Sequence, residues 1–502
     1  MLAWTIYISF GGALVLMLLP KGGVRAARVV ALLAALAGLA IAVADFARRP
    51  SGELVTVVQV SWIRSLGLEY HLAADGISLT LVLLTGIVAV AGVLFSWNIE
   101  QRANEFFAFY LALIGGVYGV FLSFDLLLLF VFYEIAIVPK YFLIAIWGST
   151  RREYAAMKLA LYSFVGSAMV LIGLIAAYVV AGARTMDLVQ LSQFPFPVHF
   201  QMWAFPLVFV GFGILAGLWP FHTWAPTGHV AAPTAASMLL AGVVMKLGAY
   251  GCLRVAMMLF PRGLDPWGFH VLGLGSWREV FALLALVGIV YGAMVALVQK
   301  DFKFVIGYSS VSHMGFVLLG LMTLQQIGLD GAVLQMFSHG VLAGLLFAVV
   351  GRMVYDRTHT RDLAELSKMS LGKVLPFAAA TFVLAGMASI GLPGFSGFVA
   401  ELQVLIGTWR SFPVFVVIAG VGIVIGIAYT WRAMQMAFFG ASHNSSVGSA
   451  AYPPISIPER IAAMLLLAAS IVVGLYPQLL LRVIIPALHS PMFDGLWKGG
   501  VR

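Results

Sequence analysis

Apolar runs of about 20 residues follow one another along nearly the whole chain, with short polar segments between them. A helix of that length crosses the hydrocarbon core of a bilayer, because each residue adds about 1.5 Å. We therefore expect an all-α polytopic membrane protein. The pattern predicts roughly fourteen transmembrane helices, near residues 2–20, 26–45, 76–97, 106–123, 125–148, 156–181, 202–219, 231–254, 279–299, 303–324, 327–354, 374–409, 412–438 and 458–481.

Two of these runs contain residues that break helices. The run 374–409 is too long for one ordinary span and includes Pro393 and Gly394, and another run is interrupted at Pro220. Irregular backbone at membrane depth is tolerated only where protein or water satisfies its polar groups, and paired broken helices are typical of transporters built from repeats. We expect two inverted five-helix repeats with discontinuous helices, at 106–260 and 261–440, between N-terminal helices with an outer loop at 1–105 and a C-terminal helix and tail at 441–502.

Composition excludes several classes of protein. The chain is 62% hydrophobic and 10% charged, which excludes a soluble domain. Its one cysteine, Cys252, excludes disulfides, iron–sulfur ligation and thiolate zinc sites within the chain. No glycine-rich nucleotide fold and no haem motif is present, so we expect no cofactor and no redox chemistry in this chain. The net charge of +9 is interpreted as loop charge that orients the protein in the membrane, and nucleic acid is not expected as a partner.

The basic residues give a modest indication of orientation. With the N-terminus outside, the inner loops hold fourteen Lys and Arg, from Lys21 to Arg460, and the outer loops hold ten, from Arg48 to Arg502. Positive charge concentrates on the cytoplasmic side of membrane proteins, so both termini are expected on the non-cytoplasmic face, in a bacterial inner membrane. The apolar start of the chain has no basic n-region and is interpreted as a retained span. The segment 46–71 alternates partly, and an outer hairpin there is one interpretation.

Five ionisable residues lie inside apolar runs. They are Glu134, Lys246, His313, His339 and Glu401. A charged side chain at the centre of a bilayer costs about 2.5–3.5 kcal/mol on insertion scales, so such residues usually face the protein interior and serve ion or proton transfer. Each one taken alone could be a buried polar group satisfied by a neighbour. Five along one chain favour a pathway.

Several short motifs, taken together, are specific enough to indicate a family. They include Asp75-Gly-Ile-Ser, Tyr-Glu134 with Val-Pro139, Tyr154-Ala-Ala-Met-Lys158, Pro220-Phe-His222-Thr-Trp, Ala-Pro233-Thr-Ala-Ala-Ser, Met-Lys246-Leu-Gly-Ala-Tyr-Gly, Tyr308-Ser-Ser-Val-Ser-His313-Met-Gly-Phe, Phe-Ser-His339-Gly and Gly391-Leu-Pro-Gly-Phe. Over about residues 70–440 the chain resembles the antiporter-like subunits of proton-pumping NADH:quinone oxidoreductase, respiratory complex I. Glu401, where the L and N branches usually carry lysine, and the end of the chain after the last span favour the M (chain 4) branch.

The resemblance implies a role for each matching residue. Glu134 would be the paired carboxylate of a first half-channel, Lys246 the central lysine, His313 and His339 the continuation of the axis, and Glu401 the terminal site of a second half-channel. A neighbouring charge changes the proton affinity of such groups, and histidine titrates near neutral pH. Electron transfer to quinone would occur in partner subunits, and L-like and N-like antiporter-like subunits would be membrane-arm neighbours.

The chain departs from the family at one important position. Seven residues before His222, where the family carries lysine, stands Leu215. Thr227 likewise replaces a family aspartate, while Lys140 occurs where an apolar residue is usual. One interpretation is that Lys140 partly replaces the missing cation, because its charge sits on a flexible four-carbon stem. The alternative is that Lys140 extends to the membrane interface.

Other interpretations stay open. Lys158 is either part of the pathway, as the resemblance implies, or an interfacial lysine. Lys300, Asp301 and Lys303 are expected to form a solvated turn, and the charged segment 356–362 a cytoplasmic loop that contacts partners. The function expected is proton translocation in a complex I-type assembly. A subunit of an Mrp-type cation/proton antiporter or of a membrane-bound hydrogenase is the first alternative, and a structural paralogue that does not pump, favoured by Leu215, is the second.

Overall fold

The computed structural model describes the chain except residues 21, 50, 269, 271–272, 441–451 and 500–502. Lys21, Arg502 and part of the expected C-terminal segment 441–502 therefore lie outside the described residues. The described chain begins with α1 (Ala3–Leu18), α2 (Val24–Arg48), β1 (Val55–Ile63), η1 (Arg64–Leu66), β2 (Leu68–Ala74) and α3 (Gly76–Phe95). It ends with α21 (Ile457–Leu475), α22 (Gln478–Leu488), η8 (Pro491–Phe493) and α23 (Asp494–Gly499).

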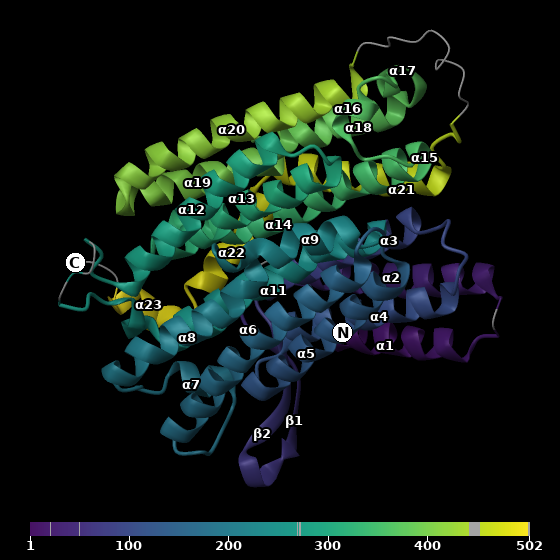
Figure 1. Ribbon diagram of the computed structural model, residues 1–502. Helices are drawn as coiled ribbons and strands as arrows, with labels where there is room; N and C mark the ends of the chain where they lie inside the picture. Colours follow the sequence, from purple (N-terminus) through teal and green to yellow (C-terminus); the bar gives the residue numbers. More distant parts are fainter. Residues whose placement is uncertain (21, 50, 269, 271–272, 441–451, 500–502) are drawn as a thin grey trace.

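Two longer series of helices lie between these parts (Figure 1). The first contains α4 (Ala103–Leu122), α5 (Leu126–Trp147), α6 (Arg152–Val180), α7 (Leu188–Ser192), α8 (Val198–Ala216), η2 (Phe221–Thr223), α9 (Trp224–Ala231), α10 (Thr234–Leu239), η3 (Leu240–Val244), α11 (Met245–Gly251) and η4 (Cys252–Met257). The second contains η5 (Pro261–Leu264), α12 (Trp277–Val298), α13 (Phe302–Met322), α14 (Gln326–Ala348), η6 (Val349–Tyr355), α15 (Asp356–Thr358), α16 (Leu363–Leu366), α17 (Leu371–Val374), α18 (Pro376–Ser389), α19 (Ser396–Ser411) and α20 (Pro413–Phe438).

The all-α membrane fold is confirmed, but the number of spans is not the expected one. Among the described residues, 12 helices are long and apolar enough to cross a membrane, or up to 13 if the bent pair Gln478–Leu488 and Pro491–Trp497 forms one span. The expected first span corresponds to α1, which has only 16 residues. The run 374–409 is divided between α18 and α19, so neither half has the length of a full span.

Both predicted helix breaks are present. Helix α8 ends at Gly217, whose φ of 85° is the left-handed conformation that glycine adopts at helix ends without strain. Helix α18 ends at Ser389, and Gly391 and Gly394 have φ values of 79° and 97° before α19 begins. Each break interrupts the fourth long helix of its series, as paired repeats would require. The repeat boundaries themselves stay a prediction.

Wide π-helical turns interrupt two of the most buried helices. Segments η3 and η4 flank α11, and η6 continues α14. A π turn widens the helix by one residue and often occurs next to functional side chains. Lys246 is the second residue after η3. The buried lysine noted in the sequence therefore lies next to a π-helical segment.

Aspartates at helix N-termini fix where several spans begin. Asp75, Asp125 and Asp301 accept hydrogen bonds from backbone N–H groups in the first turns of α3, α5 and α13. The hairpin β1–β2 precedes α3, with Val55 paired to Ala74, so a hairpin at this part of the chain is confirmed, and its place on the outer side stays a prediction (Figure 1). Asp125 also accepts from the backbone N–H of Glu69 in β2, and burial raises the pKa of this carboxyl.

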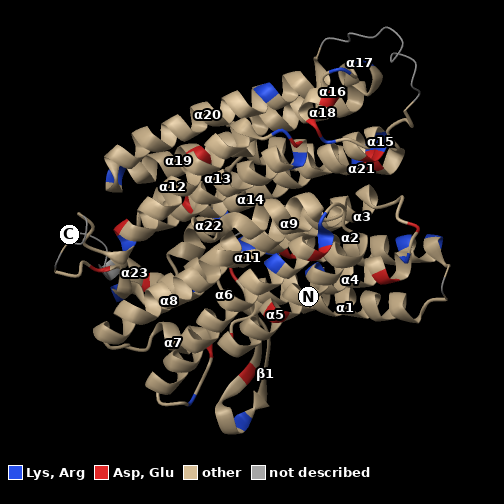
Figure 2. Cartoon of the chain, in the orientation of Figure 1, with Lys and Arg blue, Asp and Glu red and all other residues tan. Residues whose placement is uncertain are grey.

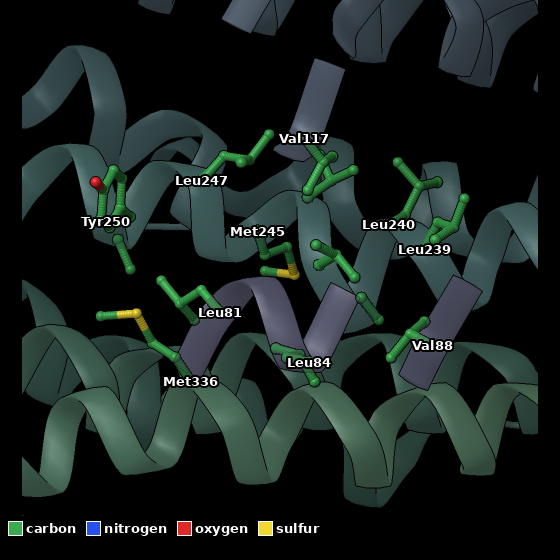
Figure 3. Close-up of a cluster of buried hydrophobic side chains, with 14 of the residues drawn as sticks. Leu81, Leu84, Val88, Val117, Leu239, Leu240, Met245, Leu247, Tyr250 and Met336 are labelled. Carbon is green, nitrogen blue, oxygen red and sulfur yellow. The ribbon is translucent and has the colours of Figure 1, made fainter. Parts of the chain in front are cut away.

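Helix α3 lies at the centre of the packed apolar core. Figure 3 shows Leu81, Leu84 and Val88 of α3 gathered with Leu239 and Met336 of other helices. The start of α3 is packed against the C-terminal helix α22: a Cβ on Gly76 would lie 1.7 Å from the carbonyl oxygen of Val483, and one on Gly52 would lie 2.1 Å from the same oxygen. Only glycine allows this approach of two backbones.

Candidate functional site: a buried polar series

Charged side chains occur mainly near the ends of the helices, with a smaller number inside the bundle (Figure 2). Lys246 is one of the internal ones and is completely buried. Its Nζ donates to the carbonyl oxygen of Ala241, in η3, and lies 2.9 Å from Nδ1 of His339 in α14. The expectation that Lys246 faces the protein interior with a polar partner is confirmed, and the π turn supplies one of its partners.

The two histidines continue the series from Lys246. The rings of His339 and His313 are parallel, with an interplanar angle of 8° and centroids 5.6 Å apart. In His313, Nδ1 lies 2.8 Å from the carbonyl oxygen of Ser309, and Nε2 lies 2.9 Å from that of Ser389. Oγ of Ser309 lies 3.3 Å from Nδ1 and Oγ of Ser389 lies 3.4 Å from Nε2, so each ring nitrogen has a carbonyl and a hydroxyl oxygen beside it.

Glu401 ends the series just beyond the break between α18 and α19. Its Oε1 lies 3.5 Å from Nε2 of His313 and accepts a hydrogen bond from Gln335 at 3.3 Å. Only 5% of Glu401 is exposed. A cavity of about 20 Å³ is lined by Glu401, His313, Ser389 and Tyr429, which is room for about one water molecule. Lys246, His339, His313 and Glu401 therefore form an unbroken series of neighbouring titratable groups.

Glu134 and Lys140 form a second, separate group on α5. Lys140 is 1% exposed, and its Nζ donates to Oγ of Ser163, on α6, at 3.3 Å. The interpretation in which Lys140 extends to the membrane interface is therefore wrong. The lysine lies within electrostatic reach of Glu134. Glu134 itself is only half-buried in the isolated chain, but its Oε1 is buried and has no hydrogen-bond partner.

The vacant lysine position is filled by packing. Leu215 is 1% exposed in α8, and a Cβ on Gly248 of α11 would lie 2.9 Å from the carbonyl carbon of Leu215. Among the hydrogen bonds between described residues, none joins Glu134 or Lys140 to Lys246. The first half of the expected axis is therefore interrupted where the lysine is missing, and the second half is continuous.

The position of Lys158 does not decide between a pathway lysine and an interfacial lysine. The side chain is half-buried, with Nζ 3.5 Å from Oγ1 of Thr227 and about 6 Å from the ring centroids of Tyr154 (6.0 Å) and Tyr162 (5.9 Å). Thr227 thus offers a neutral hydroxyl where the family has a carboxylate. His222 is buried within electrostatic reach of Lys158.

The expectation of a solvated turn at 300–303 is wrong for one of its residues. Lys300 is exposed, but Lys303 is 3% exposed and donates to the carbonyl oxygen of Ala232 at 2.7 Å and to Oγ of Ser237 at 3.1 Å. Asp301 caps α13 and pairs with Arg361 at 3.2 Å. The position of Lys303 two residues into an apolar run was a signal for burial.

From the sequence, no site or pairing role was assigned to several further buried polar residues. His229 of α9 is fully buried with both ring nitrogens unpartnered, and it sits in an apolar run seven residues after His222, which is the signal that could have found it. Arg254 and Asp75 form a buried ion pair at 2.5 Å. In the segment 356–362, Arg357 is bound to Glu459 at 2.8 Å, so this arginine is engaged inside the chain.

Comparison with known proteins places this arrangement in one family. Residues 123–426 match the family described as NADH:quinone oxidoreductase/Mrp antiporter, TM. The NADH-quinone oxidoreductase subunit M of Pseudomonas aeruginosa is 36% identical over 511 aligned positions, which cover 97% of each protein. A chain of respiratory complex I from Thermus thermophilus with bound NADH superposes with a TM-score of 0.87 and 26% identity, covering 99% of this chain and 100% of that one.

A chain of the Mrp complex from Dietzia sp. DQ12-45-1b has the same fold, with a TM-score of 0.84 and 20% identity over 99% of this chain and 98% of that one. The family match spans more than half of the sequence, and it includes Glu134, Lys246, His313, His339 and Glu401. The chain is therefore an integral membrane protein of the NADH:quinone oxidoreductase/Mrp antiporter family.

Proposed function

We propose that this chain is a proton-translocating membrane-arm subunit of a complex I-type NADH:quinone oxidoreductase. The observation that carries the proposal is the buried series Lys246, His339, His313 and Glu401. Each neighbour in it can be a proton donor in one state and an acceptor in another. A buried charge is energetically unfavourable in a membrane protein. Ionisable residues that persist there in a connected series usually mark a path for protons or ions.

Proton transfer along the series depends on the charge of each neighbour. A proton on Lys246 disfavours one on His339, and an ionised Glu401 favours one on His313. A change in charge at Lys246 therefore changes the proton affinity of its neighbour His339. The same effect passes from each neighbour to the next as far as Glu401. In this proposal Glu401 releases the proton, and its location beside the broken helix supports this role, because freed backbone groups and water commonly form ion sites there.

The energy for these steps would come from outside the chain. NADH oxidation and quinone reduction belong to partner subunits in the proposal, with L-like and N-like subunits as neighbours in the membrane arm. No cofactor is assigned to this chain. The proposed orientation places both termini on the non-cytoplasmic face, as the distribution of basic residues favours.

Two alternatives are distinguishable by experiment. A subunit of an Mrp-type antiporter or of a membrane-bound hydrogenase would share this fold, but its complex would not couple NADH oxidation to transport. A paralogue that does not pump is favoured by Leu215, which interrupts the first half of the axis. Against it stands the second half of the axis, which retains all four titratable groups in contact.

The test uses the assembled complex in sealed vesicles. Glu401→Gln keeps the size of the side chain and removes its ability to ionise, so we expect fewer protons translocated per electron with NADH oxidation retained. Gln403→Glu, on the same helix, is the matched control for a change of charge nearby. An unchanged ratio in Glu401→Gln would reject proton translocation through this subunit.

A further inference from the structure

Three side chains of the kinds that bind metal ions meet where the hairpin β1–β2 joins the helices (Figure 1). Glu69 and His71 come from β2, and Asp187 directly precedes α7. A ligand atom of each lies within 4.8 Å of a ligand atom of the other two. His71 and Asp187 are 116 positions apart in the sequence, so the fold brings this cluster together.

Backbone hydrogen bonds hold the segments that carry the cluster. The N–H of Phe124, just before α5, donates to the carbonyl oxygen of His71 at 2.9 Å. The N–H of Leu188 donates to the carbonyl oxygen of Phe124 at 2.7 Å. Alternate residues of a strand share one face, so Glu69 and His71 extend to the same side of β2. The three side chains are thus presented by a hydrogen-bonded backbone.

The imidazole of His71 has the orientation of a metal ligand. The residue is 4% exposed, with Nδ1 2.6 Å from Oδ2 of Asp187 and Nε2 3.3 Å from Oγ1 of Thr56. A histidine that binds a metal usually donates its other ring N–H to an oxygen, which fixes the ring and the tautomer. The hydroxyl of Thr56 provides that oxygen. With its proton on Nε2, His71 presents the lone pair of Nδ1 beside a carboxylate.

Both carboxylates are also held in place. Oδ1 of Asp187 accepts a hydrogen bond from the backbone N–H of Gln190 at 2.8 Å, which leaves Oδ2 directed at His71. Oε2 of Glu69 accepts from the side-chain amide of Gln59 at 2.6 Å. Asp187 is 2% exposed, whereas Glu69 is only half-buried. An ion can therefore reach the cluster past Glu69, and a water molecule has room on the same side.

The charges around the cluster favour a cation. A third carboxylate, that of Asp125, accepts from the backbone N–H of Glu69 at 3.1 Å and is completely buried. Among the ion pairs between described residues, none joins a lysine or arginine to Glu69, Asp125 or Asp187. A protonated His71 balances only one of the three negative charges. Buried charges are normally paired or bound to metal ions.

We propose that Glu69, His71 and Asp187 bind a zinc ion, which fastens the hairpin β1–β2 to the segment before α7. An imidazole nitrogen with two carboxylates suits Zn²⁺, whereas Ca²⁺ and Mg²⁺ prefer oxygen ligands throughout. Water takes the fourth position of the tetrahedron. Ligand atoms of a tetrahedral zinc ion lie about 3.3 Å apart, so the contact between His71 and Asp187 widens from 2.6 Å to that distance on binding. The site is independent of the proposed translocation function.

Replacement of Glu69 tests the site in a chain that should fold normally. Glu69→Gln keeps the size of the side chain and can still accept the hydrogen bond from Gln59. The full chain in detergent is freed of metal with EDTA and dialysed against Zn²⁺. We expect one zinc ion per unmodified chain and an affinity lowered by about 100-fold or more in Glu69→Gln, because loss of a ligand exceeds the effect of its supporting partners. Glu53→Gln, at an exposed glutamate before β1, is the matched control.

Two results of this experiment would overturn the zinc site. One is an unmodified chain that retains no zinc, and the other is equal affinity in Glu69→Gln and the unmodified chain, which would indicate zinc bound elsewhere. Competition identifies the class of ion. An excess of Ca²⁺ should leave the bound zinc in place, and its displacement by Ca²⁺ would contradict a nitrogen ligand.

Spectra of Co²⁺ in place of zinc test the histidine. A four-coordinate Co²⁺ absorbs strongly in visible light, so the unmodified chain should gain this absorption and His71→Gln should not. His199→Gln, at an exposed histidine before the first turn of α8 ends, should behave like the unmodified chain. Asp187→Asn keeps the oxygen that accepts from Gln190 and provides a second variant if His71→Gln does not fold. Full absorption in a folded variant that lacks either ligand would reject the assignment.

The fastening of the hairpin is measured by hydrogen exchange. Zinc should slow the exchange of the backbone N–H groups of β2 and of Leu188 in the unmodified chain, because the ion joins these two segments. The exchange in Glu69→Gln should not respond to zinc. Equal exchange of the unmodified chain with and without zinc would show that the ion does not fasten the hairpin and would overturn that part of the proposal.

Discussion

Nε2 of His313 lies 3.5 Å from Oε1 of Glu401 while it also contacts the carbonyl oxygen of Ser389. The histidine on α13 is thus held between a backbone oxygen of α18 and a carboxylate of α19, on the two sides of the broken helix. A movement of one half-helix relative to the other would change which oxygen the imidazole contacts. The contact between His313 and Glu401 therefore couples the titratable series to the broken helix between α18 and α19.

Replacement of His313 should separate the two ends of the series. In the proposed series His313 passes a proton between His339 and Glu401, so we expect His313→Asn to lower protons per electron by the same amount as Glu401→Gln. The double variant should be no worse than either single one, because both interrupt the same series. Thr381→Val, which removes the hydrogen bond from its hydroxyl to the carbonyl oxygen of Phe377 within α18, is the control. Additive losses in the double variant would contradict a single path.

Lys140 and Leu215 provide a test of compensation. If Lys140 supplies the cation missing at position 215, Lys140→Met should lower coupled pumping and leave NADH oxidation intact. Leu215→Lys should then restore pumping in the Lys140→Met background, because it returns the cation to its usual helix. The measurement is the number of protons translocated per electron in the unmodified chain and in both variants. Normal pumping in Lys140→Met would reject compensation.

The buried pair of Asp75 and Arg254 should contribute to stability and not to transport. Arg254→Met leaves the Asp75 carboxylate unpaired inside the protein, which should destabilise the fold by about 3–5 kcal/mol. Asp75→Asn in the same chain removes that charge and keeps the side-chain oxygen that caps α3, so the double variant should recover part of the loss. Thermal unfolding of the detergent-solubilised complex checks both. Equal stability of the single and double variants would contradict this explanation.

The approach of α14 to η3 depends on Gly340. A Cβ there would lie 2.6 Å from the carbonyl oxygen of Gly242, so Gly340→Ala should push the helices apart and destabilise the protein by about 1–3 kcal/mol. Gly344 has no atom within 4 Å of its Cβ position, and Gly344→Ala should be neutral or stabilising by up to about 1 kcal/mol. Because His339 precedes Gly340, pumping should fall in the first variant only. Comparable behaviour of the two variants would argue against a tight contact.

The sequence predicted most of the membrane helices, and it singled out the residues that lie together in the second half of the candidate site, because their signals are local. Long apolar runs reveal membrane helices, Gly391 and Pro393 reveal a break, and Glu401 is conspicuous in its apolar surroundings. The apolar runs around Lys303 and His229 were local signals of burial, but the partners of these side chains depend on segments distant in the sequence, such as Ser237 for Lys303. The fate of Lys140 was also undecidable locally, since Ser163 reaches it from another helix.

The contact between Gly76 and Val483 has a consequence for how the chain is made. About 400 residues separate the two positions, and synthesis at about 5–20 residues per second needs roughly 20 to 80 seconds to cover them. Throughout that interval α3 stands in the membrane without the helix against which its first residue finally packs. Until α22 emerges from the ribosome, lipid or an insertion factor must cover that surface, so a nascent chain halted before Val483 should be especially sensitive to membrane proteases.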